Sequence, residues 1–350
     1  MELSDDSEVS PIRAPHGNVI SRPLLSVEHL TVKFRTDEGE LTAVDDVSYS
    51  MAEGGIMVLL GESGSGKSVS MRAVMGLLPT PPAEVTGRIL FRGEDMQTLS
   101  NSERRALRGR RIALVPQDAQ SALNPVLTVG WQIGEMLRVH GRAGRREARR
   151  AAIELMELVH IPDAAYRADQ YPHEFSGGMR QRVTIAMAIA LQPDLIIADE
   201  PTTALDVTTQ SQILRLLQEL HQDHGVSIIL ITHDFGVAAE FADRVAVMYA
   251  GNIVEIGPAK EVLRNASHPY TLGLRNSIPL VSGSGHLEPL KGMPPDLLHR
   301  PAGCPFHPRC SWAQAGLCDE NRPDLIEVRN RQVACFRSDE VLAADSDHNE

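Results

Sequence analysis

Residues 61–68 read GESGSGKS, a glycine-rich loop that ends in a lysine and a serine and fits the pattern GxxxxGKS. Such a loop can bind phosphate, because its glycines let several backbone N–H groups point at one anion and the following helix adds partial positive charge. Lys67 can reach the β- and γ-phosphates of a nucleotide, and the Ser68 hydroxyl can ligate Mg²⁺. The residues that we expect to contact the phosphates are Gly61, Ser63, Gly64, Ser65, Gly66, Lys67 and Ser68.

The segments on either side of this loop predict the strand and the helix that the motif requires. Ile56 to Leu60 is an apolar run of strand length, and a helical pattern after the loop stops before the prolines of residues 79–82. A glycine-rich turn that fits the pattern by chance is the alternative. The order strand, loop, helix disfavours that alternative, because it places the loop at a helix N-terminus.

Two adjacent acids close a second apolar run, in the sequence DLIIADE of residues 194–200. Leu195 to Ala198 has the pattern of a buried strand, and an acid at the carboxyl end of a parallel strand faces the nucleotide crevice. We therefore expect Asp199 to hold Mg²⁺ through water and Glu200 to polarise the attacking water. A carboxylate base supplies roughly 10²–10⁴ in rate. A strand that ends at an acidic turn is common by itself, but the phosphate loop upstream disfavours that reading.

A second glycine-containing helix start lies shortly before these acids. Ser176-Gly177-Gly178 precedes a helical pattern from Arg180 to Leu191, so it is a second feature that can bind phosphate. One nucleotide should not need two such loops from the same chain. The simplest explanation is a dimer, in which this loop covers the γ-phosphate held by the phosphate loop of the partner.

In this order, GESGSGKS, SGGMRQR, LIIADE and ITHD resemble the motifs of the ATP-binding subunit of an ABC transporter, over roughly residues 24–265. The resemblance implies ATP and Mg²⁺ as ligands and the α/β fold of a P-loop NTPase. That fold has a RecA-like core, an antiparallel β subdomain and a helical subdomain, which we expect at about residues 120–180.

The same resemblance implies roles for four further residues. Gln117, in RIALVPQD, would contact Mg²⁺ and transmit closure to membrane subunits, and His233, after VSIILIT, would contact the γ-phosphate. Phe34 would stack on adenine, and Asp206 would meet the partner chain. Structural alternatives are a core role for Phe34, a structural histidine at 233 and an N-cap role for Asp206. The helix after this N-cap would have the apolar face Ile213, Leu216, Leu217 and Leu220. The expected catalytic set is Lys67, Gln117, Glu200 and His233.

Three stretches narrow the resemblance to one branch of the family. DAQSALNPVLTVGWQI (118–133) resembles importers of oligopeptides and dipeptides, and HPYTLGLRNSIP (268–279) resembles the peptide and nickel importer branch. YPHEFSGGMRQR also resembles the importers of oligopeptides and dipeptides, with Phe175 and Met179 in place of the commoner Leu and Gln. The implied function is ATP-driven import of di- or oligopeptides. Importers of nickel, glutathione or sugar derivatives stay as alternatives, as does a soluble ABC ATPase of translation or DNA repair.

The resemblance also implies partners and a location. The partners would be a second, homologous ATP-binding subunit or a second copy of this chain, two transmembrane permease subunits and an extracytoplasmic substrate-binding protein. The chain would lie peripherally on the cytoplasmic face of the membrane. Its sequence agrees, since no apolar run is long enough to cross a bilayer and acids stand where a signal peptide needs basic and apolar residues. With a formal net charge of −12 over 350 residues, it is not expected to bind nucleic acid.

All four cysteines lie near the end of the chain, at Cys304, Cys310, Cys318 and Cys335. In a cytoplasmic protein such thiols are reduced, so we expect metal binding rather than disulfides. Four thiolates can bind zinc or an iron–sulfur cluster, and the spacing alone does not choose between them. GCPFHPRC resembles the extension of peptide importers, some of which carry a 4Fe-4S cluster there. The resemblance therefore predicts such a cluster, with Zn²⁺ or unligated thiols as alternatives and His307 as a fallback ligand.

The acidic ends of the chain complete the predicted domain organisation. Residues 1–10 and 338–350 together carry nine acids and no Lys or Arg. We therefore expect residues 1–23 and 338–350 to be disordered, solvated tails. Between them we expect the ATPase domain at residues 24–265 and a C-terminal extension with the four cysteines at residues 266–337.

Overall fold

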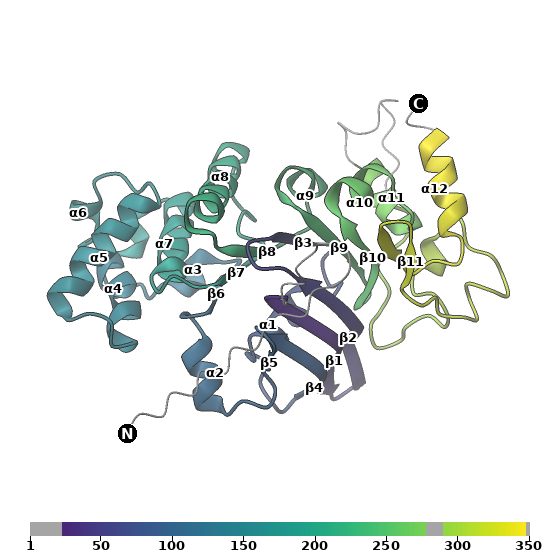
Figure 1. The fold of residues 1–350 in the computed structure, drawn as a ribbon, viewed down its shortest axis with the longest axis horizontal. Helices are drawn as coiled ribbons and strands as arrows, with labels where there is room; N and C mark the ends of the chain where they lie inside the picture. The colour runs from purple at the N-terminus through teal and green to yellow at the C-terminus, as the bar shows by residue number, and fades with distance from the viewer. Residues whose placement is uncertain (1–22, 278–289, 348–350) are drawn as a thin grey trace, which may run out of the picture.

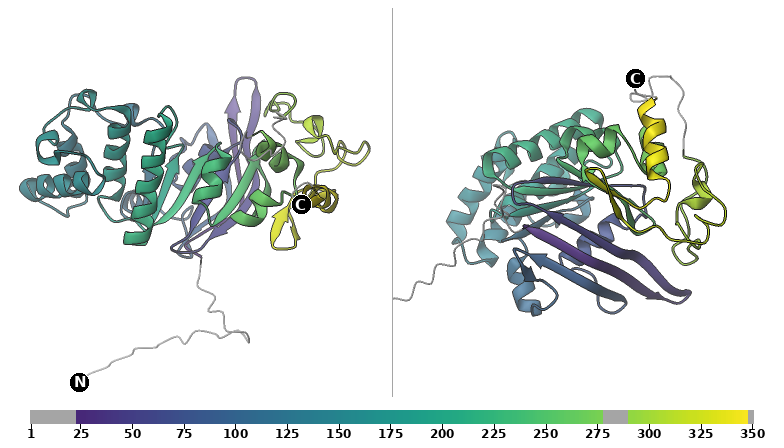
Figure 2. Two further views of the ribbon diagram at one scale, coloured as in Figure 1. Left: turned by 90° about the horizontal axis from the view of Figure 1, so that it is seen from above. Right: turned by 45° about the vertical axis from the view of Figure 1, so that its right-hand side comes forward.

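The computed structural model describes residues 23–277 and 290–347, which form a mixed α/β fold with two sheets (Figures 1 and 2). The predicted N-terminal tail lies, but for its last residue, outside the described residues. The strands are β1 (Leu25–Thr36), β2 (Gly39–Met51), β3 (Ile56–Leu60), β4 (Ala83–Phe91), β5 (Glu94–Asp95), β6 (Ile112–Val115), β7 (Leu195–Asp199), β8 (Ser227–Thr232), β9 (Arg244–Tyr249), β10 (Asn252–Pro258), β11 (Ile326–Val328) and β12 (Arg331–Val333). The helices are α1 (Lys67–Val74), α2 (Asn101–Leu107), α3 (Ala119–Ala122), α4 (Val129–Val139), α5 (Arg145–Leu158), α6 (Ala164–Arg167), η1 (Pro172–Glu174), α7 (Gly177–Ile189), α8 (Val207–His224), α9 (Phe235–Phe241), α10 (Ala259–Arg264), α11 (Pro269–Asn276), η2 (His307–Arg309) and α12 (Ser338–Asp347).

An eight-stranded sheet forms the centre of the molecule, in the order β11-β12-β10-β9-β3-β8-β7-β6. The strands from β9 to β6 run parallel, and β3, β7 and β8 are buried along their whole length, as strands covered on both faces must be. The strands predicted from the apolar runs at Ile56–Leu60 and Leu195–Ala198 are confirmed. The carboxyl ends of these parallel strands meet at one edge of the sheet, where the phosphate loop and the two acids follow.

A four-stranded antiparallel sheet, in the order β2-β1-β4-β5, packs on one face of the central sheet (Figure 1). The core between the two sheets contains Val32 of β1, Val44 of β2, Met57 and Leu59 of β3, and Met71 of α1. These residues hold the small sheet against the strand that leads into the phosphate loop. The predicted antiparallel β subdomain is thereby confirmed.

Helices cover the opposite face of the central sheet, and a second apolar core lies between them and the strands. In β3 the side chains alternate between the two cores, so Val58 packs here while its neighbours pack toward the small sheet. The predicted apolar face of α8 is confirmed, because its buried residues are Ile213, Leu216, Leu217 and Leu220.

A group of helices from α3 to the start of α7 extends away from the small sheet and the C-terminal extension (Figure 1). Its first helix begins at Ala119, directly after Gln117 and Asp118. The elements between Ala119 and the start of α7 agree with a helical subdomain, whose expected limits of about 120–180 stay a prediction. This arrangement places Gln117 between the central sheet and the helices.

The C-terminal extension adds two strands to the central sheet, which the sequence did not predict. Strand β12 pairs antiparallel with β10. At this junction Arg331 donates to Glu255 at 3.2 Å, and the two side chains are only 1% and 0% exposed. Glu255 also accepts hydrogen bonds from the backbone N–H groups of Ser267 and His268. Because losing one member would leave the other charge unpaired in the interior, this pair ties the extension firmly to the ATPase core.

The prediction of a disordered tail at residues 338–350 is wrong for most of that segment. Residues Ser338–Asp347 form α12, and its Asp345 makes an ion pair with Arg275 of α11, with side chains 1% and 7% exposed. Ser338, Val341 and Leu342 of α12 are buried as well. The acids of this segment suggested solvation, but one of them is neutralised by a buried arginine while apolar neighbours pack beside it. The last residues of the chain, 348–350, lie outside the described part.

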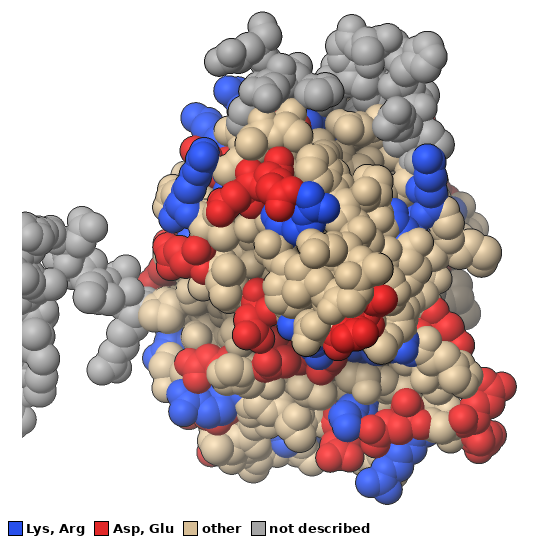
Figure 3. All heavy atoms as spheres, turned by 90° about the vertical axis from the view of Figure 1, so that its right-hand side faces the viewer, with Lys and Arg blue, Asp and Glu red and all other residues tan. Residues whose placement is uncertain are grey.

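The surface gives two further observations. Every helix among the residues that the structure describes is too short or too polar to span a bilayer. On the face nearest the C-terminal extension, Lys and Arg side chains are interspersed with Asp and Glu side chains (Figure 3). That face therefore presents charges of both signs side by side.

Candidate active site

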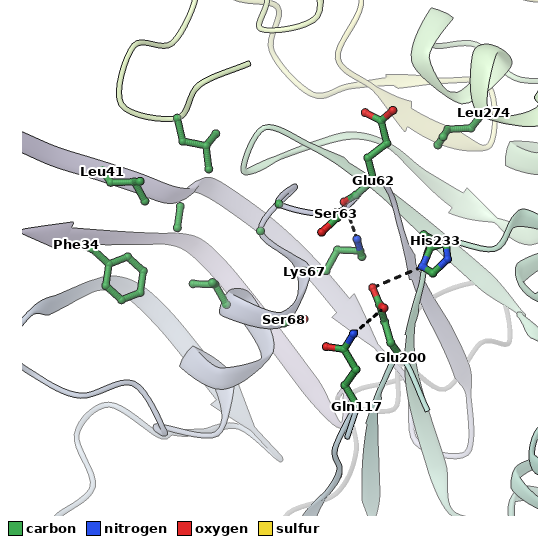
Figure 4. A pocket seen from close by; sticks show the side chains of 15 residues that line it. Phe34, Leu41, Glu62, Ser63, Lys67, Ser68, Gln117, Glu200, His233 and Leu274 are labelled. Atoms are coloured by element: carbon green, nitrogen blue, oxygen red, sulfur yellow. Dashed lines mark hydrogen bonds and ion pairs between the residues drawn. The ribbon is translucent and has the colours of Figure 1, made fainter. Parts of the chain in front are cut away.

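A cleft with a volume of about 650 Å³ opens at the edge of the central sheet where β3, β7 and β8 end (Figure 4). The predicted residues that line it are Phe34, Ser63, Gly64, Gly66, Lys67, Ser68, Gln117, Glu200 and His233. Three more, Gly61, Ser65 and Asp199, are buried behind this lining. The cleft is also lined by residues that the sequence did not single out, namely Leu41, Ala43, Glu62, Val69, Leu274 and Leu297.

The phosphate loop wraps around its own lysine. Lys67 Nζ donates to the carbonyl oxygens of Gly61 at 2.7 Å and of Glu62 at 2.8 Å. Burial lowers the pKa of Lys67, and the negative charges of Glu200, Asp199 and Glu62 oppose that shift. An ammonium at the centre of a tight loop is placed to meet phosphate oxygens.

Two glycines let the phosphate loop press against neighbouring strands. A Cβ atom on Gly66, whose φ is +101°, would lie 2.6 Å from the carbonyl oxygen of Ala43 on β2. A Cβ atom on Gly61 would lie 2.2 Å from the carbonyl oxygen of Met248 on β9. Backbone atoms on both sides leave no room for a side chain, so the loop is fixed between the small sheet and the central sheet.

Two of the three predicted Mg²⁺ ligands, Ser68 and Asp199, are in direct contact. Ser68 Oγ donates to Asp199 Oδ1 at 2.6 Å. Burial raises the pKa of the Asp199 carboxyl, while the hydrogen bond from Ser68 opposes the rise. Hydroxyl and carboxylate oxygens are the donors that Mg²⁺ prefers, so this pair fits that ion. Gln117, the third predicted ligand, instead contacts Glu200.

Glu200 is held by three side chains around its carboxylate, of which Figure 4 shows Gln117 and His233. Gln117 Nε2 donates to it at 3.1 Å, Thr203 Oγ1 donates to it at 3.0 Å, and His233 Nδ1 lies 3.7 Å from its other oxygen. The backbone of Glu200 has a φ of 45°, which is strained for this residue, and its N–H donates to Ile231 of β8 at 3.0 Å. A carboxylate fixed in this way can take a proton from a water molecule without turning away from it.

Thr203 is a contact that the sequence reasoning missed. It follows Glu200 by three residues in the segment DEPTT, and its backbone N–H donates to the Glu200 carbonyl at 3.1 Å. This turn brings the threonine hydroxyl back onto the carboxylate. Pro201, directly after the acid pair, is the signal that could have predicted the turn.

One end of the cleft is apolar. Phe34 of β1 and Leu41 and Ala43 of β2 line it, and Leu274 and Leu297 of the C-terminal region line the same cleft. Phe34 is only partly buried and packs against the core between the two sheets. It therefore contacts the core and the cleft at once, and offers a ring face on which a planar base can stack.

The helix start at residues 176–178 lies outside the lining of this cleft. Gly178 packs against Thr209 of α8, and Thr209 donates to the Asp206 carboxylate through its N–H at 2.9 Å and its hydroxyl at 2.7 Å. The N-cap role of Asp206 is thereby confirmed. Gly178 and Asp206 both contact Thr209. Neither residue lines the cleft that contains the phosphate loop of the same chain.

Gly178→Ala is expected to destabilise the chain, because the added Cβ would lie 2.4 Å from Thr209 Cγ2. Overpacking of this kind typically costs about 1–3 kcal/mol. Thr209→Ser removes that methyl group and keeps the hydroxyl that binds Asp206, so the double variant should recover most of the loss. Chemical denaturation of the single and double variants measures the effect. Equal instability of Gly178→Ala with and without Thr209→Ser would contradict the contact.

The four cysteines line one small cavity in the extension, together with His268, Phe306, His307 and Trp312 among others. All four, which lie within the described residues, are free thiols. Burial raises the pKa of Cys304, that of Cys310 to about 11 and that of Cys335 to about 12. Cys304, Cys310 and Cys318 thus reach one partly buried cavity from the irregular segment around η2, and Cys335 reaches it from just after β12.

The four thiols are not arranged as ligands of one metal ion. Within residues 23–277 and 290–347, no group of three or more His, Cys, Asp or Glu side chains is arranged to hold a metal ion. His307, the predicted fallback ligand, directs its Nδ1 to the carbonyl oxygen of Cys304 at 3.0 Å. The four sulfurs that the predicted cluster would need line one cavity, but they are not arranged as a ligand set in the described part of the chain.

Comparison with known proteins identifies the family. The model of the family described as "ABC transporter" matches residues 44–203, and that of "Oligopeptide/dipeptide transporter, C-terminal region" matches residues 254–318. The dipeptide transport ATP-binding protein DppD of Bacillus subtilis (strain 168) is 49% identical over 331 residues, which cover 92% of this chain and 98% of that protein. This chain belongs to the ABC transporter ATP-binding family. The predicted family membership is confirmed, and this ABC protein is a transport ATPase.

Solved structures confirm the predicted fold of the ABC ATPase. The ATP-binding cassette MJ0796, as a dimer in a post-hydrolysis state bound to ADP and Pi, has a TM-score of 0.60 at 28% identity. The match covers 67% of this chain and 98% of that one. CbiO1 of Clostridium perfringens, part of the ABC transporter complex cbiONQ, has a TM-score of 0.58 at 28% identity and covers 69% of this chain and 90% of its own.

Proposed function

We propose that this ABC ATPase powers the import of di- or oligopeptides across the cytoplasmic membrane. One observation carries the proposal: a single chain joins the cleft around Glu200 to a C-terminal region that matches the oligopeptide/dipeptide transporter model at residues 254–318. The likeness to a dipeptide transport ATP-binding protein along 92% of the chain supports the same substrate class.

In the proposed binding mode, ATP lies along the cleft from its apolar end to the phosphate loop. The adenine stacks on Phe34, and the phosphates rest on the N–H groups of residues 61–68 beside the Lys67 ammonium. Ser68 and Asp199 would hold Mg²⁺, with Gln117 as the third proposed ligand. When bound, Mg²⁺ neutralises the charge on the β- and γ-phosphate oxygens.

In the proposed hydrolysis step, Glu200 takes a proton from the water that attacks the γ-phosphorus. The bond from that phosphorus to the bridging oxygen breaks, and its electron pair leaves with ADP. Gln117 and Thr203 donate hydrogen bonds to Glu200 at 3.1 Å and 3.0 Å, which keeps the carboxylate directed at the water. His233, on the same carboxylate, contacts the γ-phosphate and stabilises its developing charge.

A second chain completes the proposed site. Residues 176–178 can bind phosphate at a helix N-terminus, yet they lie outside the cleft of their own chain, which supports a head-to-tail dimer. The dimeric structure of the related cassette MJ0796 supports the same assembly. In this dimer Ser176, Gly177 and Gly178 cover the γ-phosphate held by the partner, and Asp206 lies beside them. The partner is a second, homologous ATP-binding subunit or a second copy of this chain.

The remaining proposed partners are two transmembrane permease subunits and an extracytoplasmic substrate-binding protein, with this chain on the cytoplasmic face of the membrane. Gln117 supports the direction of coupling, because it touches Glu200 and directly precedes α3 and the helical group. A change at the γ-phosphate can therefore pass through Gln117 to the helices, which we assign as the permease contact. We keep residues 24–265 as the ATPase domain and treat everything from residue 266, including α12, as the extension.

We further propose that the four cysteines hold a 4Fe-4S cluster. Their convergence on one cavity supports this, because such a cluster takes four thiolate ligands. The thiols would lose their protons on binding. The cluster would stabilise the extension because it would cross-link Cys304, Cys310, Cys318 and Cys335. Zn²⁺ is the alternative, since it accepts the same donors.

The metal is decided by anaerobic purification followed by iron and zinc analysis and a visible absorption spectrum. A 4Fe-4S cluster predicts a brown protein with about four irons per chain. A colourless, iron-free protein that retains zinc would reject the cluster. A Cys335→Ser variant should lose the absorption band, while the far-UV circular dichroism of the whole chain should stay close to that of the wild type.

Peptide import is tested in proteoliposomes that contain this ATPase with its permease and binding subunits. Labelled di- and tripeptides should accumulate only with MgATP on the side of the ATPase, and they should stimulate ATP hydrolysis. Uptake of nickel or glutathione in place of peptides would show that the chain belongs to one of the alternative importers. A chain that hydrolyses ATP but associates with no membrane subunit would support the soluble alternative.

A further inference from the structure

We infer that Arg309, which lies within the cysteine motif, is a positioning residue for the phosphate loop and couples the state of the cysteine cavity to ATP affinity. The inference rests on the proposed role of residues 61–68 in ATP binding. It concerns a contact between parts of the chain that are far apart in sequence, and it assigns a task to Glu62, a cleft residue that the mechanism above does not use.

The central contact is a two-pronged ion pair between Arg309 and Glu62. Arg309 Nη1 donates to one carboxylate oxygen of Glu62 at 2.7 Å, and Nη2 donates to the other at 3.0 Å. The side chains are 5% and 27% exposed, respectively. A buried, bidentate pair of this kind fixes both the distance and the orientation of the two groups. Glu62 is the second residue of the phosphate loop, so the loop is fixed with it.

The guanidinium of Arg309 is itself held rigidly. Its carbon lies 5.7 Å from the ring centroid of Tyr249 and 5.9 Å from that of Phe306, so two aromatic rings support it. Its Nε donates to the carbonyl oxygen of Lys291 at 2.9 Å. Arg309 therefore cannot swing away without losing all of these contacts together.

The backbone of Glu62 is anchored from the same region. Its N–H donates to the hydroxyl of Tyr270, in α11, at 2.9 Å. The ring of Tyr270 lies 4.6 Å from that of Tyr249 and 5.4 Å from that of Phe306, centroid to centroid. The backbone of Glu62 directly and its side chain through Arg309 thus contact one aromatic cluster, which Tyr270 and Phe306 of the extension form with Tyr249 of β9.

Electrostatics explains why the pair matters for ATP. Glu62 lines the cleft, and its carbonyl oxygen accepts a hydrogen bond from Lys67 at 2.8 Å. In Figure 4 its carboxylate points away from Lys67. A carboxylate left unpaired beside this loop would repel the phosphates that the loop must hold. Arg309 neutralises that charge and keeps it directed away from the ammonium.

The cysteine cavity lies at the other end of this connection. Arg309 closes the short helix η2 and directly precedes Cys310, while Phe306 and His307 line the cavity together with all four cysteines. A change in the packing of these sulfurs, such as a substitution at Cys310, would shift η2 and with it the guanidinium. The phosphate loop would then lose its support, so a protein with an intact cysteine site should bind ATP more tightly.

The first test compares MgATP binding by full-length variants in isothermal titration calorimetry. Arg309→Gln should raise the dissociation constant about tenfold, which corresponds to roughly 1.4 kcal/mol, with kcat at saturating ATP changed by less than about twofold. Adding Glu62→Gln removes the unpaired charge and should restore affinity to near the wild-type value. If the double variant binds as weakly as Arg309→Gln alone, or if Arg309→Gln leaves the affinity unchanged, the inference is wrong.

The matched control is Arg322→Gln. Arg322 also joins the extension to the ATPase, through a contact with Asp45 at 2.6 Å, but it does not touch the phosphate loop. Its loss should leave ATP affinity within about twofold of the wild type. An equal loss of affinity in both variants would mean that any loosening of the extension suffices, which contradicts a specific role for Arg309.

The second test addresses the cysteine cavity. Cys310→Ser should weaken MgATP binding in the wild-type background and have little further effect in Arg309→Gln, because both variants interrupt one connection. Additive losses in the double variant would overturn the coupling. Failure of the wild-type chain to bind MgATP at all would instead reject the proposed function, so the two failures are distinguishable.

Discussion

Glu200→Gln is expected to reduce ATP turnover by roughly 10²–10⁴, the range that a carboxylate base supplies. The amide keeps the size of the side chain but cannot accept the proton of the attacking water. ATP binding should stay close to wild type, because Lys67, Ser68 and Asp199 are unchanged. Steady-state phosphate release measures the first effect, and calorimetric titration with MgATP measures the second.

A matched control for this variant is Thr203→Val. It removes the hydroxyl that donates to Glu200 at 3.0 Å but leaves the carboxylate in place. The loss in turnover should therefore be far smaller than that of Glu200→Gln. Normal hydrolysis by Glu200→Gln, or an equal loss in both variants, would show that Glu200 is not the base.

Gly177→Asp is expected to reduce ATP turnover of the assembled importer by about 10² or more, as the loss of a preorganised phosphate contact does. In the proposed dimer the new carboxylate would face the γ-phosphate bound by the partner chain and repel it. The fold should tolerate the change, because an acid is favourable at a helix N-terminus and a Cβ here meets Leu205 only at 3.4 Å. MgATP binding by the isolated variant chain should be unchanged, since this loop lies outside its own cleft.

Gly177→Ala separates charge from bulk in this experiment. It adds the same Cβ without the carboxylate, so it should retain most of the turnover. Loss of MgATP binding by the isolated Gly177→Asp chain would contradict the assignment, because the loop would then act on the nucleotide of its own chain. Undiminished turnover of the importer that carries Gly177→Asp would contradict it as well.

The parts of the site that could be predicted are those encoded in short, continuous segments. The phosphate loop combines a strand-length apolar run with glycines at fixed spacing, and the acids Asp199 and Glu200 end a second such run. Because parallel strands share their carboxyl edge, these two segments had to meet. Their approach is observed as the hydrogen bond between Ser68 and Asp199 at 2.6 Å.

The contacts that could not be predicted join residues that are distant in sequence and unremarkable by themselves. Glu62 and Arg309 are separated by 247 positions, and neither has a neighbour that marks it as half of an ion pair. The pairing of β12 with β10 is similar, since β12 has only three residues and carries no turn signal that would direct it to the central sheet. Such contacts depend on how the whole chain packs, not on local preference.

The error at the C-terminus has the same origin. Acids near a chain end usually indicate a solvated segment. Here Asp345 faces a buried arginine that belongs to α11, and this partner is 70 positions away. Composition predicts the average environment of a segment, whereas the ion pair of Asp345 and the burial of Val341 and Leu342 are particular contacts of α12.

The most direct test of the central claim is a cryo-EM structure of the assembled importer that carries Glu200→Gln and is saturated with MgATP. We predict ATP between two chains, with the loop of residues 61–68 on its phosphates from one side and Ser176, Gly177 and Gly178 of this chain on the γ-phosphate bound by the other ATP-binding subunit. A structure in which nucleotide occupies the cleft while the second glycine loop stays remote from every nucleotide would contradict the account.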